Sequence, residues 1–145
     1  MTVIAIKNGV MAADSRISGS YNTLGIKIYR ADKALIGFAG EVTQALAFVD
    51  WYRDRKRRQP DIANEDDWCA LVLTPVGIEY WDKSLRPMLQ IESIAAIGSG
   101  APFAIAAMDA GKSAVQAAQI ACKRDPSCAM PIISERLRVR SKAKR

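Results

Sequence analysis

The 145-residue chain contains no histidine. This absence excludes Ser-His-Asp and Cys-His catalysis, and it excludes metal sites that depend on imidazole ligands. Any acyl transfer on this chain therefore needs another proton acceptor. An N-terminal α-amine is one of the few alternatives, because it can take the proton from the side chain of its own residue.

Cysteine is scarce as well. Cys69, Cys122 and Cys128 form an odd set without the spacing of a metal site. The N-terminus lacks the basic start and the long apolar stretch of a signal peptide. Free, semi-buried thiols in a reducing compartment are the simplest interpretation, so we expect a cytoplasmic protein. We expect neither a metal nor a cofactor.

Long hydrophobic runs are also missing. No apolar stretch reaches the roughly eighteen residues that span a bilayer, so we expect no membrane partner. The composition, 50% hydrophobic and 25% charged, is that of an ordinary globular protein, and the length suits one domain.

The net charge of +6 is concentrated at one end. Residues 136–145 contain six cations and no acid, which leaves the rest of the chain neutral (6 − 6 = 0). We therefore expect a single domain over residues 1–135 and a basic tail over residues 136–145. Such a tail can solubilise the chain or bind nucleic acid. No aromatic residue is interleaved with the cations, so a nucleic-acid partner is not expected.

The hydrophobic pattern predicts strands first, then a helix, more strands, two helices and a last strand. Strands are expected at residues 3–7, 10–13, 26–30, 34–39, 70–73, 78–81, 93–97 and 132–139. Helices are expected at residues 41–57, 98–108 and 113–123. The Asn8-Gly9 pair predicts a tight hairpin between the first two strands. Several strands are continuous apolar runs, which indicates burial on both faces. Two sheets between layers of helices would satisfy this, giving an α+β fold with a four-layer αββα sandwich.

The second residue is a candidate nucleophile. Removal of Met1 would leave Thr2 with a free amine, whose pKa of roughly 7.7–8 allows part of it to be neutral at pH 7. Many proteins begin with Met-Thr, so this feature alone carries little weight. Several motifs further along the chain strengthen the case for Thr2 as a nucleophile.

Thr2 leads into the first strand, and the second strand ends in Ala-Ala-Asp at residues 12–14. A third strand contains Gly-Ile-Lys-Ile-Tyr-Arg at residues 25–30, and a fourth ends in Ala-Gly at residues 39–40. Residues 97–100 read Ile-Gly-Ser-Gly before a helix. In this order the motifs resemble the proteasome β-subunit family of N-terminal nucleophile (Ntn) hydrolases, which includes the bacterial HslV peptidase. The resemblance extends from Thr2 to about Cys128.

The resemblance implies a threonine peptidase and a role for each matching residue. Thr2 would supply the nucleophilic hydroxyl and the amine that accepts its proton. Lys27 would lower the pKa of that hydroxyl, and Asp14 would hold Lys27 in place. The candidate residues with supporting roles are Gly40 as oxyanion donor, Ser99 as hydrogen-bond partner of the amine, and Asp125 as a carboxylate near the site.

Each residue also has a plainer interpretation. Asp14 could simply end a strand, and Lys27 could point outward from one. Gly40 could serve only the turn from strand to helix, and Ser99 could be an ordinary helix cap. A phosphate site at residues 98–100 is disfavoured, because the chain has no longer Gly-rich loop and no Walker lysine.

The chain departs from the family pattern in three places. Its first hairpin is shorter, and it is short after residue 130. The family also has a serine three residues after the aspartate; here either Cys128 occupies that position or Ser127 comes one residue early. These departures leave open a catalytically inactive Ntn-fold assembly protein, as well as an amidase for small molecules.

The resemblance further implies a polypeptide substrate, a homo-oligomeric ring and a possible ATP-dependent unfoldase as partner. The short length is similar to that of proteasome-like proteins of phages and prophages.

Overall fold

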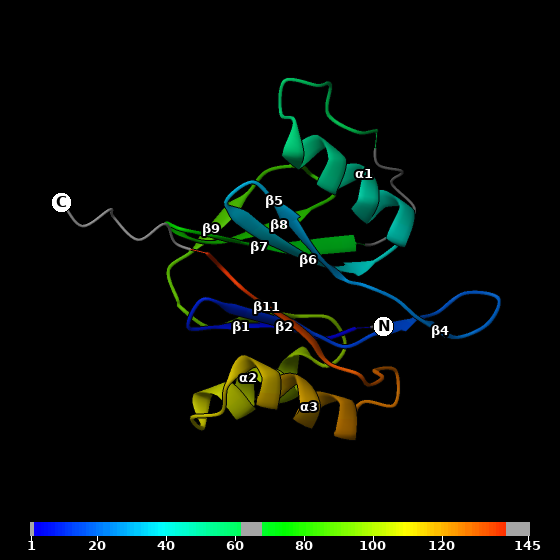
Figure 1. Cartoon of the computed structure of the whole chain (residues 1–145), viewed down its shortest axis with the longest axis vertical. Helices are drawn as coiled ribbons and strands as arrows, with labels where there is room; N and C mark the ends of the chain where they lie inside the picture. The colour runs from blue at the N-terminus through cyan, green and yellow to red at the C-terminus, as the bar shows by residue number, and fades with distance from the viewer. Residues whose placement is uncertain (1, 62–67, 139–145) are drawn as a thin grey trace.

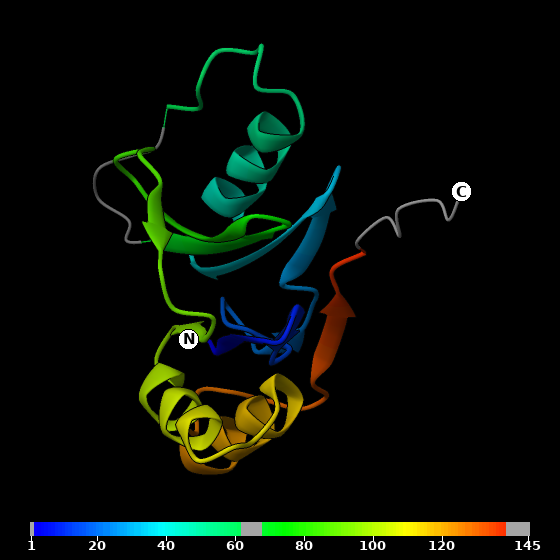
Figure 2. The same ribbon diagram turned by 90° about the vertical axis from the view of Figure 1, so that its left-hand side faces the viewer.

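Two β-sheets are stacked between layers of helices (Figures 1 and 2). The computed structural model describes residues 2–61 and 68–138. The first sheet has the strand order β10 (Ala95–Ile97), β1 (Ile4–Lys7), β2 (Val10–Ala13), β11 (Ile133–Arg136). The second has the order β5 (Ile28–Ala31), β6 (Ala34–Gly40), β7 (Trp68–Thr74), β8 (Gly77–Asp82), β9 (Met88–Gln90). A short ribbon pairs β3 (Arg16–Ile17) with β4 (Thr23–Leu24).

The helices lie on the outer faces of the two sheets. Helix α1 (Val42–Arg53) covers the five-stranded sheet, while α2 (Ala101–Asp109) and α3 (Ala114–Arg124) cover the four-stranded sheet (Figure 2). The neighbouring strands are antiparallel. The predicted α+β, four-layer αββα sandwich is therefore confirmed.

The centre of the molecule is an apolar core between the two sheets. Ile4, Ile6 and Met11 from one sheet meet Leu35 and Leu71 from the other, and all five are fully buried or nearly so. Burial of such side chains contributes roughly 1.5–3 kcal/mol each. The strands read as continuous apolar runs because their opposite faces are buried too, against the helices.

The two outer cores differ in side-chain size. Beneath α1, Phe48 lies between Trp68 and Trp81, with ring centroids 5.1 Å from each. Beneath α2 and α3 the buried residues are mostly alanines, such as Ala104 and Ala118. Small side chains let these two helices approach each other and the sheet closely.

The first helix is shorter than predicted. We expected residues 41–57, but α1 ends at Arg53, and the backbone N–H of Asp54 bonds the Trp51 carbonyl. Arg55 then turns back, with its guanidinium carbon 4.7 Å from the ring centroid of Tyr52 and 5.3 Å from that of Trp81. These cation–π contacts hold the chain in a turn where the helix would otherwise have continued.

Other predicted boundaries were close, and some elements were missed. Ser113 caps α3 with a full capping box, as expected for the helix at residues 113–123. The β3–β4 ribbon and β9 were not predicted. The last strand is β11, within the predicted 132–139, and Leu137 beyond it is buried. Residues 139–145, most of the expected basic tail, lie outside the described residues.

No helix within the described part of the chain has the length and apolar character needed to cross a membrane.

We predict that Gly37→Ala destabilises the fold through the contact between the sheets. A β-carbon at this position would lie 2.7 Å from Ile4 Cγ2 and 2.8 Å from Met11 Sδ. Overpacking of this kind typically costs about 1–3 kcal/mol. Chemical denaturation measures the loss. Gly19→Ala is the matched control, since its nearest neighbour would be 3.9 Å away. Equal stability of the two variants would contradict the described packing of the sheets.

Candidate active site

Thr2 and Asp14 are brought together by the first hairpin. The Asn8-Gly9 turn has positive φ at both residues, 52° and 73°, as the predicted tight turn requires. In the resulting register Ile4 pairs with Ala13, and the Asp14 N–H donates to the Val3 carbonyl at 3.2 Å. Thr2 and Asp14 therefore lie side by side at the end of the hairpin away from the turn.

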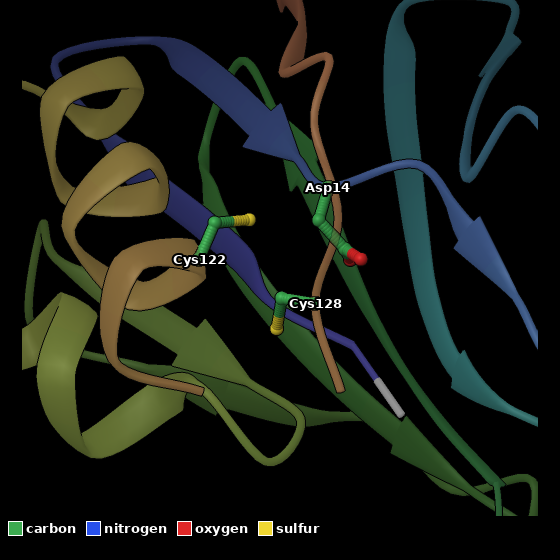
Figure 3. Close-up of side chains that lie close together, drawn as sticks. All are labelled: Asp14, Cys122 and Cys128. Atoms are coloured by element: carbon green, nitrogen blue, oxygen red, sulfur yellow. The ribbon is translucent and has the colours of Figure 1, made fainter. Parts of the chain in front are cut away.

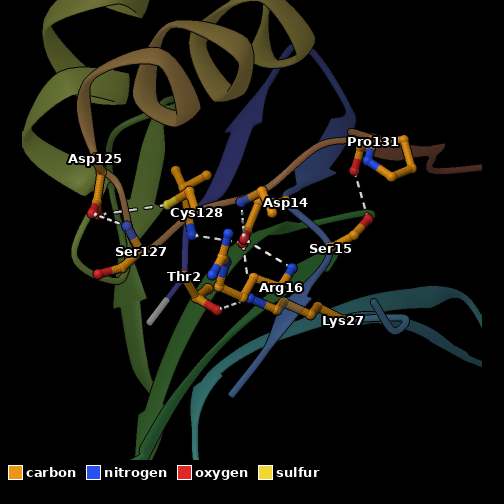
Figure 4. Close-up of polar contacts among 11 residues, drawn as sticks. Thr2, Asp14, Ser15, Arg16, Lys27, Asp125, Ser127, Cys128 and Pro131 are labelled. Atoms are coloured by element: carbon orange, nitrogen blue, oxygen red, sulfur yellow. Dashed lines mark hydrogen bonds and ion pairs between the residues drawn. The ribbon is translucent and has the colours of Figure 1, made fainter. Parts of the chain in front are cut away.

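The Asp14 carboxylate is fully buried and accepts four hydrogen bonds (Figure 4). Oδ1 accepts from the Val3 N–H at 3.1 Å and from Lys27 Nζ at 2.9 Å. Oδ2 accepts from the backbone N–H groups of Arg16 and Ala129, both at 3.1 Å. These donors offset the cost of removing the carboxylate from water. Asp14 therefore does more than end a strand.

Lys27 points into the protein from the residue before β5. Its side chain is 2% exposed, and Nζ donates to both Asp14 Oδ1 and Thr2 Oγ1. The interpretation of Lys27 as an outward-pointing strand residue is therefore wrong. The ammonium group lies between the Asp14 carboxylate and the threonine hydroxyl, so a positive charge directly faces that hydroxyl.

Glycines allow the main chain to approach Thr2 closely. The Gly100 N–H donates to the Thr2 carbonyl at 3.1 Å. Gly98 has a φ of +94°, and a β-carbon there would lie 2.0 Å from the Thr2 carbonyl oxygen. The Gly-Ser-Gly segment at residues 98–100 therefore packs against the main chain of the proposed nucleophile.

Gly40 and Ser99 share a cavity with Thr2 and Lys27. The cavity has a volume of about 230 Å³. Gly40, the last residue of β6, has a φ of +109°, a conformation that favours glycine. Ser99 is not the cap of α2, since Gly100 occupies that position. Among the described residues, Ser99 Oγ is buried without a hydrogen bond of ordinary geometry.

Asp125 lies behind this cavity, at the end of α3. Its Oδ1 accepts from the Ser127 N–H at 2.9 Å, and its Oδ2 accepts from Cys128 Sγ at 3.5 Å. The nearby Ser99 hydroxyl, followed by the groups of Ser127 and Cys128, lowers the pKa of the Asp125 carboxyl. Asp125 thus reaches the cavity through Ser99 and does not itself line it.

Sequence reasoning gave no role to several other residues of this cavity. The additional lining residues are Arg16, Ile17, Ser18, Phe38, Ala39, Val42 and Gly98. They lie within four residues after Asp14, within two residues of Gly40, or, for Gly98, directly before Ser99. The available signal was this proximity to predicted site residues, but proximity did not indicate which side chains face the cavity.

A cluster of one carboxylate and two thiols lies next to the site. Ligand atoms of Asp14, Cys122 and Cys128 lie within 4.8 Å of one another (Figure 3). Both Asp14 oxygens already accept two hydrogen bonds each, and one faces the Lys27 ammonium. A metal ion would have to displace these donors and approach a positive charge, so the cluster does not suit a metal.

No protein-family model matches the chain, and no curated protein is similar in sequence. Solved structures do match. HslV from Trypanosoma brucei is 19% identical, with a TM-score of 0.70 over 93% of this chain and 98% of that chain. The chain has the HslV fold. This result agrees with the family that the sequence motifs resemble.

BPH from Thiobacillus denitrificans also has this fold. Its complex with epoxomicin is 18% identical, with a TM-score of 0.68 over 96% of this chain and 100% of that chain. A second BPH structure is 17% identical, with a TM-score of 0.67 over 95% and 99% of the respective chains. The HslV fold thus spans nearly the whole chain.

We predict that Asp14→Asn strongly destabilises the protein. The change leaves the Lys27 ammonium buried without its counter-ion, and breaking a buried pair costs about 3–5 kcal/mol. Chemical denaturation of the variant and the parent measures the difference. The matched control is Glu135→Gln, which breaks the half-exposed Arg30–Glu135 pair and should cost at most about 1 kcal/mol. If both variants lost the same amount of stability, the buried Asp14–Lys27 pair would not be more important to the fold than the half-exposed Arg30–Glu135 pair.

Proposed function

We propose that the protein is a threonine peptidase that acts through Thr2 after removal of Met1. The observation that carries the proposal is the buried contact between Lys27 Nζ and Thr2 Oγ1, with Asp14 behind it. A threonine that is 4% exposed and faces a buried ammonium group is unusual for a residue with only a structural role. The positive charge favours the alkoxide form of the hydroxyl and so lowers its pKa.

The proton acceptor in this proposal is the α-amine of Thr2. The chain has no histidine, so an amine with a pKa of roughly 7.7–8 is the suitable base at neutral pH. The buried Ser99 hydroxyl, which lines the same cavity, would hydrogen-bond this amine. Asp125 would fix Ser99, because that hydroxyl is the largest cause of the lowered pKa of the Asp125 carboxyl.

Peptide hydrolysis would proceed in two stages. Thr2 Oγ1 attacks the carbonyl carbon of the substrate while its proton moves to the α-amine. The Gly40 N–H would stabilise the oxyanion, a contribution of a few kcal/mol. The intermediate then collapses to an ester on Thr2, and the leaving amine takes the proton. Water hydrolyses the ester and restores the hydroxyl.

The cavity beside Thr2 supports a polypeptide as the proposed substrate. A small cavity with Phe38 and Val42 beside Thr2 suits one apolar side chain of a polypeptide. BPH, a protein with the same fold, binds epoxomicin. An amidase for small molecules is the nearest alternative, since the same nucleophile serves many amides.

We further propose that the protein forms a homo-oligomeric ring in the cytoplasm, with a possible ATP-dependent unfoldase as partner. Met88, Leu89 and Ile91 line one surface groove and are each more than half exposed. Exposed apolar side chains gathered in this way mark an interaction surface.

We predict that purified protein lacks Met1 and takes up one molecule of epoxomicin. Intact mass spectrometry before and after treatment measures both changes. Thr2→Ala should not be labelled, because it lacks the hydroxyl. Thr23→Ala, which changes an exposed threonine on β4, is the matched control and should label like the parent.

Two results would count against the peptidase. A retained Met1 would block the amine, and a free Thr2 that does not react would point to an inactive assembly protein. That second candidate is favoured by the altered segment at residues 125–130, which departs from the family pattern. If Thr2 reacts, comparison of peptide and small-amide substrates distinguishes the peptidase from the amidase.

We predict that native mass spectrometry detects a closed homo-oligomer. Ile91→Asp should weaken the assembly, because a carboxylate would be placed in the apolar groove. Val76→Asp, which changes an exposed residue outside that groove, is the matched control. A parent protein that remains monomeric at high concentration would refute the ring.

A further inference from the structure

Two thiols lie next to each other directly behind the candidate active site. Cys122 is in the last turn of α3, and Cys128 follows six residues later. Their Sγ atoms lie within 4.8 Å of each other, and both cysteines lie next to Asp14 (Figure 3). The chain between them is short, so closing a covalent loop costs little entropy.

The two thiols differ in accessibility and acidity. Cys122 is partly exposed, whereas Cys128 is only 5% exposed. The adjacent Cys128 thiol lowers the pKa of Cys122, whereas the adjacent Cys122 thiol together with burial raises the pKa of Cys128. The thiolate is the form that reacts with oxidants, so Cys122 is the group that reacts first.

Cys128 also lies against residues that position Thr2 and Asp14. Its Sγ donates to Asp125 Oδ2 at 3.5 Å. A β-carbon built on Gly100, the residue that binds the Thr2 carbonyl, would lie 3.3 Å from this sulfur. The next residue, Ala129, donates its N–H to Asp14. A displacement of Cys128 is therefore transmitted to Asp125, Gly100 and Asp14.

We propose that Cys122 and Cys128 are a reversible oxidation site, and that their disulfide slows the reaction of Thr2. The regulatory part rests on the proposed peptidase function. The oxidant is a hydroperoxide. The Cys122 thiolate attacks one peroxide oxygen, which gives a sulfenic acid and one water after protonation. The Cys128 thiol then attacks the Cys122 sulfur, forming the S–S bond and releasing a second water. The dithiol loses two electrons, and the peroxide gains them.

The Cys122–Cys128 disulfide would change the candidate active site in two ways. Oxidation removes the thiol proton that Cys128 donates to Asp125. It also draws the two sulfurs to about 2.05 Å, which moves Cys128 toward α3. The Ala129 N–H then moves away from Asp14 Oδ2, and the carboxylate that holds Lys27 loses a donor. Displacements of about 1 Å can reduce rates by roughly a hundredfold.

Treatment of the full chain with hydrogen peroxide tests the proposal. We expect a mass decrease of about 2 Da, the two hydrogens lost on disulfide formation, and a peptide cross-linked between Cys122 and Cys128. The rate of epoxomicin labelling should fall by roughly tenfold or more, and dithiothreitol should restore it. Amide exchange at Ala129, followed by NMR, should become faster in the oxidised protein.

Two variants serve as matched controls. Cys122→Ala should lose the disulfide and keep its labelling rate in peroxide. Cys69→Ala should behave like the parent, because Cys69 lies on β7 and burial raises the pKa of its thiol.

Absence of a Cys122–Cys128 disulfide would overturn the proposal. A disulfide that leaves both labelling and Ala129 exchange unchanged would overturn it as well. If reduced protein does not react with epoxomicin, the peptidase proposal fails. The cross-linked peptide and the Ala129 exchange then still decide whether the dithiol alters the site.

Discussion

The buried ion pair between Asp14 and Lys27 is the constraint on which the rest of the site depends. Two charges inside a protein are tolerated only when their remaining hydrogen-bonding capacity is met. Asp14 meets this condition with three backbone N–H donors in addition to Lys27. Those donors come from the residue before β1, from the start of the β3–β4 ribbon and from the loop after α3. Each of these segments must therefore hold its position for the pair to be stable.

The pair also joins the two sheets. Asp14 follows β2 in the four-stranded sheet, and Lys27 precedes β5 in the five-stranded sheet. Apolar packing between the sheets has no direction of its own, whereas the ion pair fixes one end of one sheet against the other. Thr2 lies at this junction and the cavity opens beside it. Because both sheets hold it, the proposed nucleophile is positioned more rigidly than a residue on a free chain end.

The sequence was sufficient to predict the four layers, the first hairpin and most element boundaries. Those features depend on local patterns, such as the apolar runs and the Asn8-Gly9 turn. The orientation of Lys27 did not follow from its neighbours, because it precedes the strand and its partners are 13 and 25 residues away. The early end of α1 likewise depends on a contact between Arg55 and the distant Trp81. Local patterns do not contain such contacts, and a resemblance to a family supplied the first of them.

Cys128 combines a packing role with the proposed sensitivity to oxidation. A thiol is a weaker donor than a hydroxyl, so Asp125 receives a longer hydrogen bond at 3.5 Å than a serine would provide. The larger sulfur fills the space beneath Gly100 and Val3, and this packing supports the main chain of Thr2. A hydroxyl at this position could not form a disulfide with Cys122, whereas a thiol can do so when a hydroperoxide accepts the two electrons. The same atom that packs against the site therefore exposes it to the redox state of its surroundings.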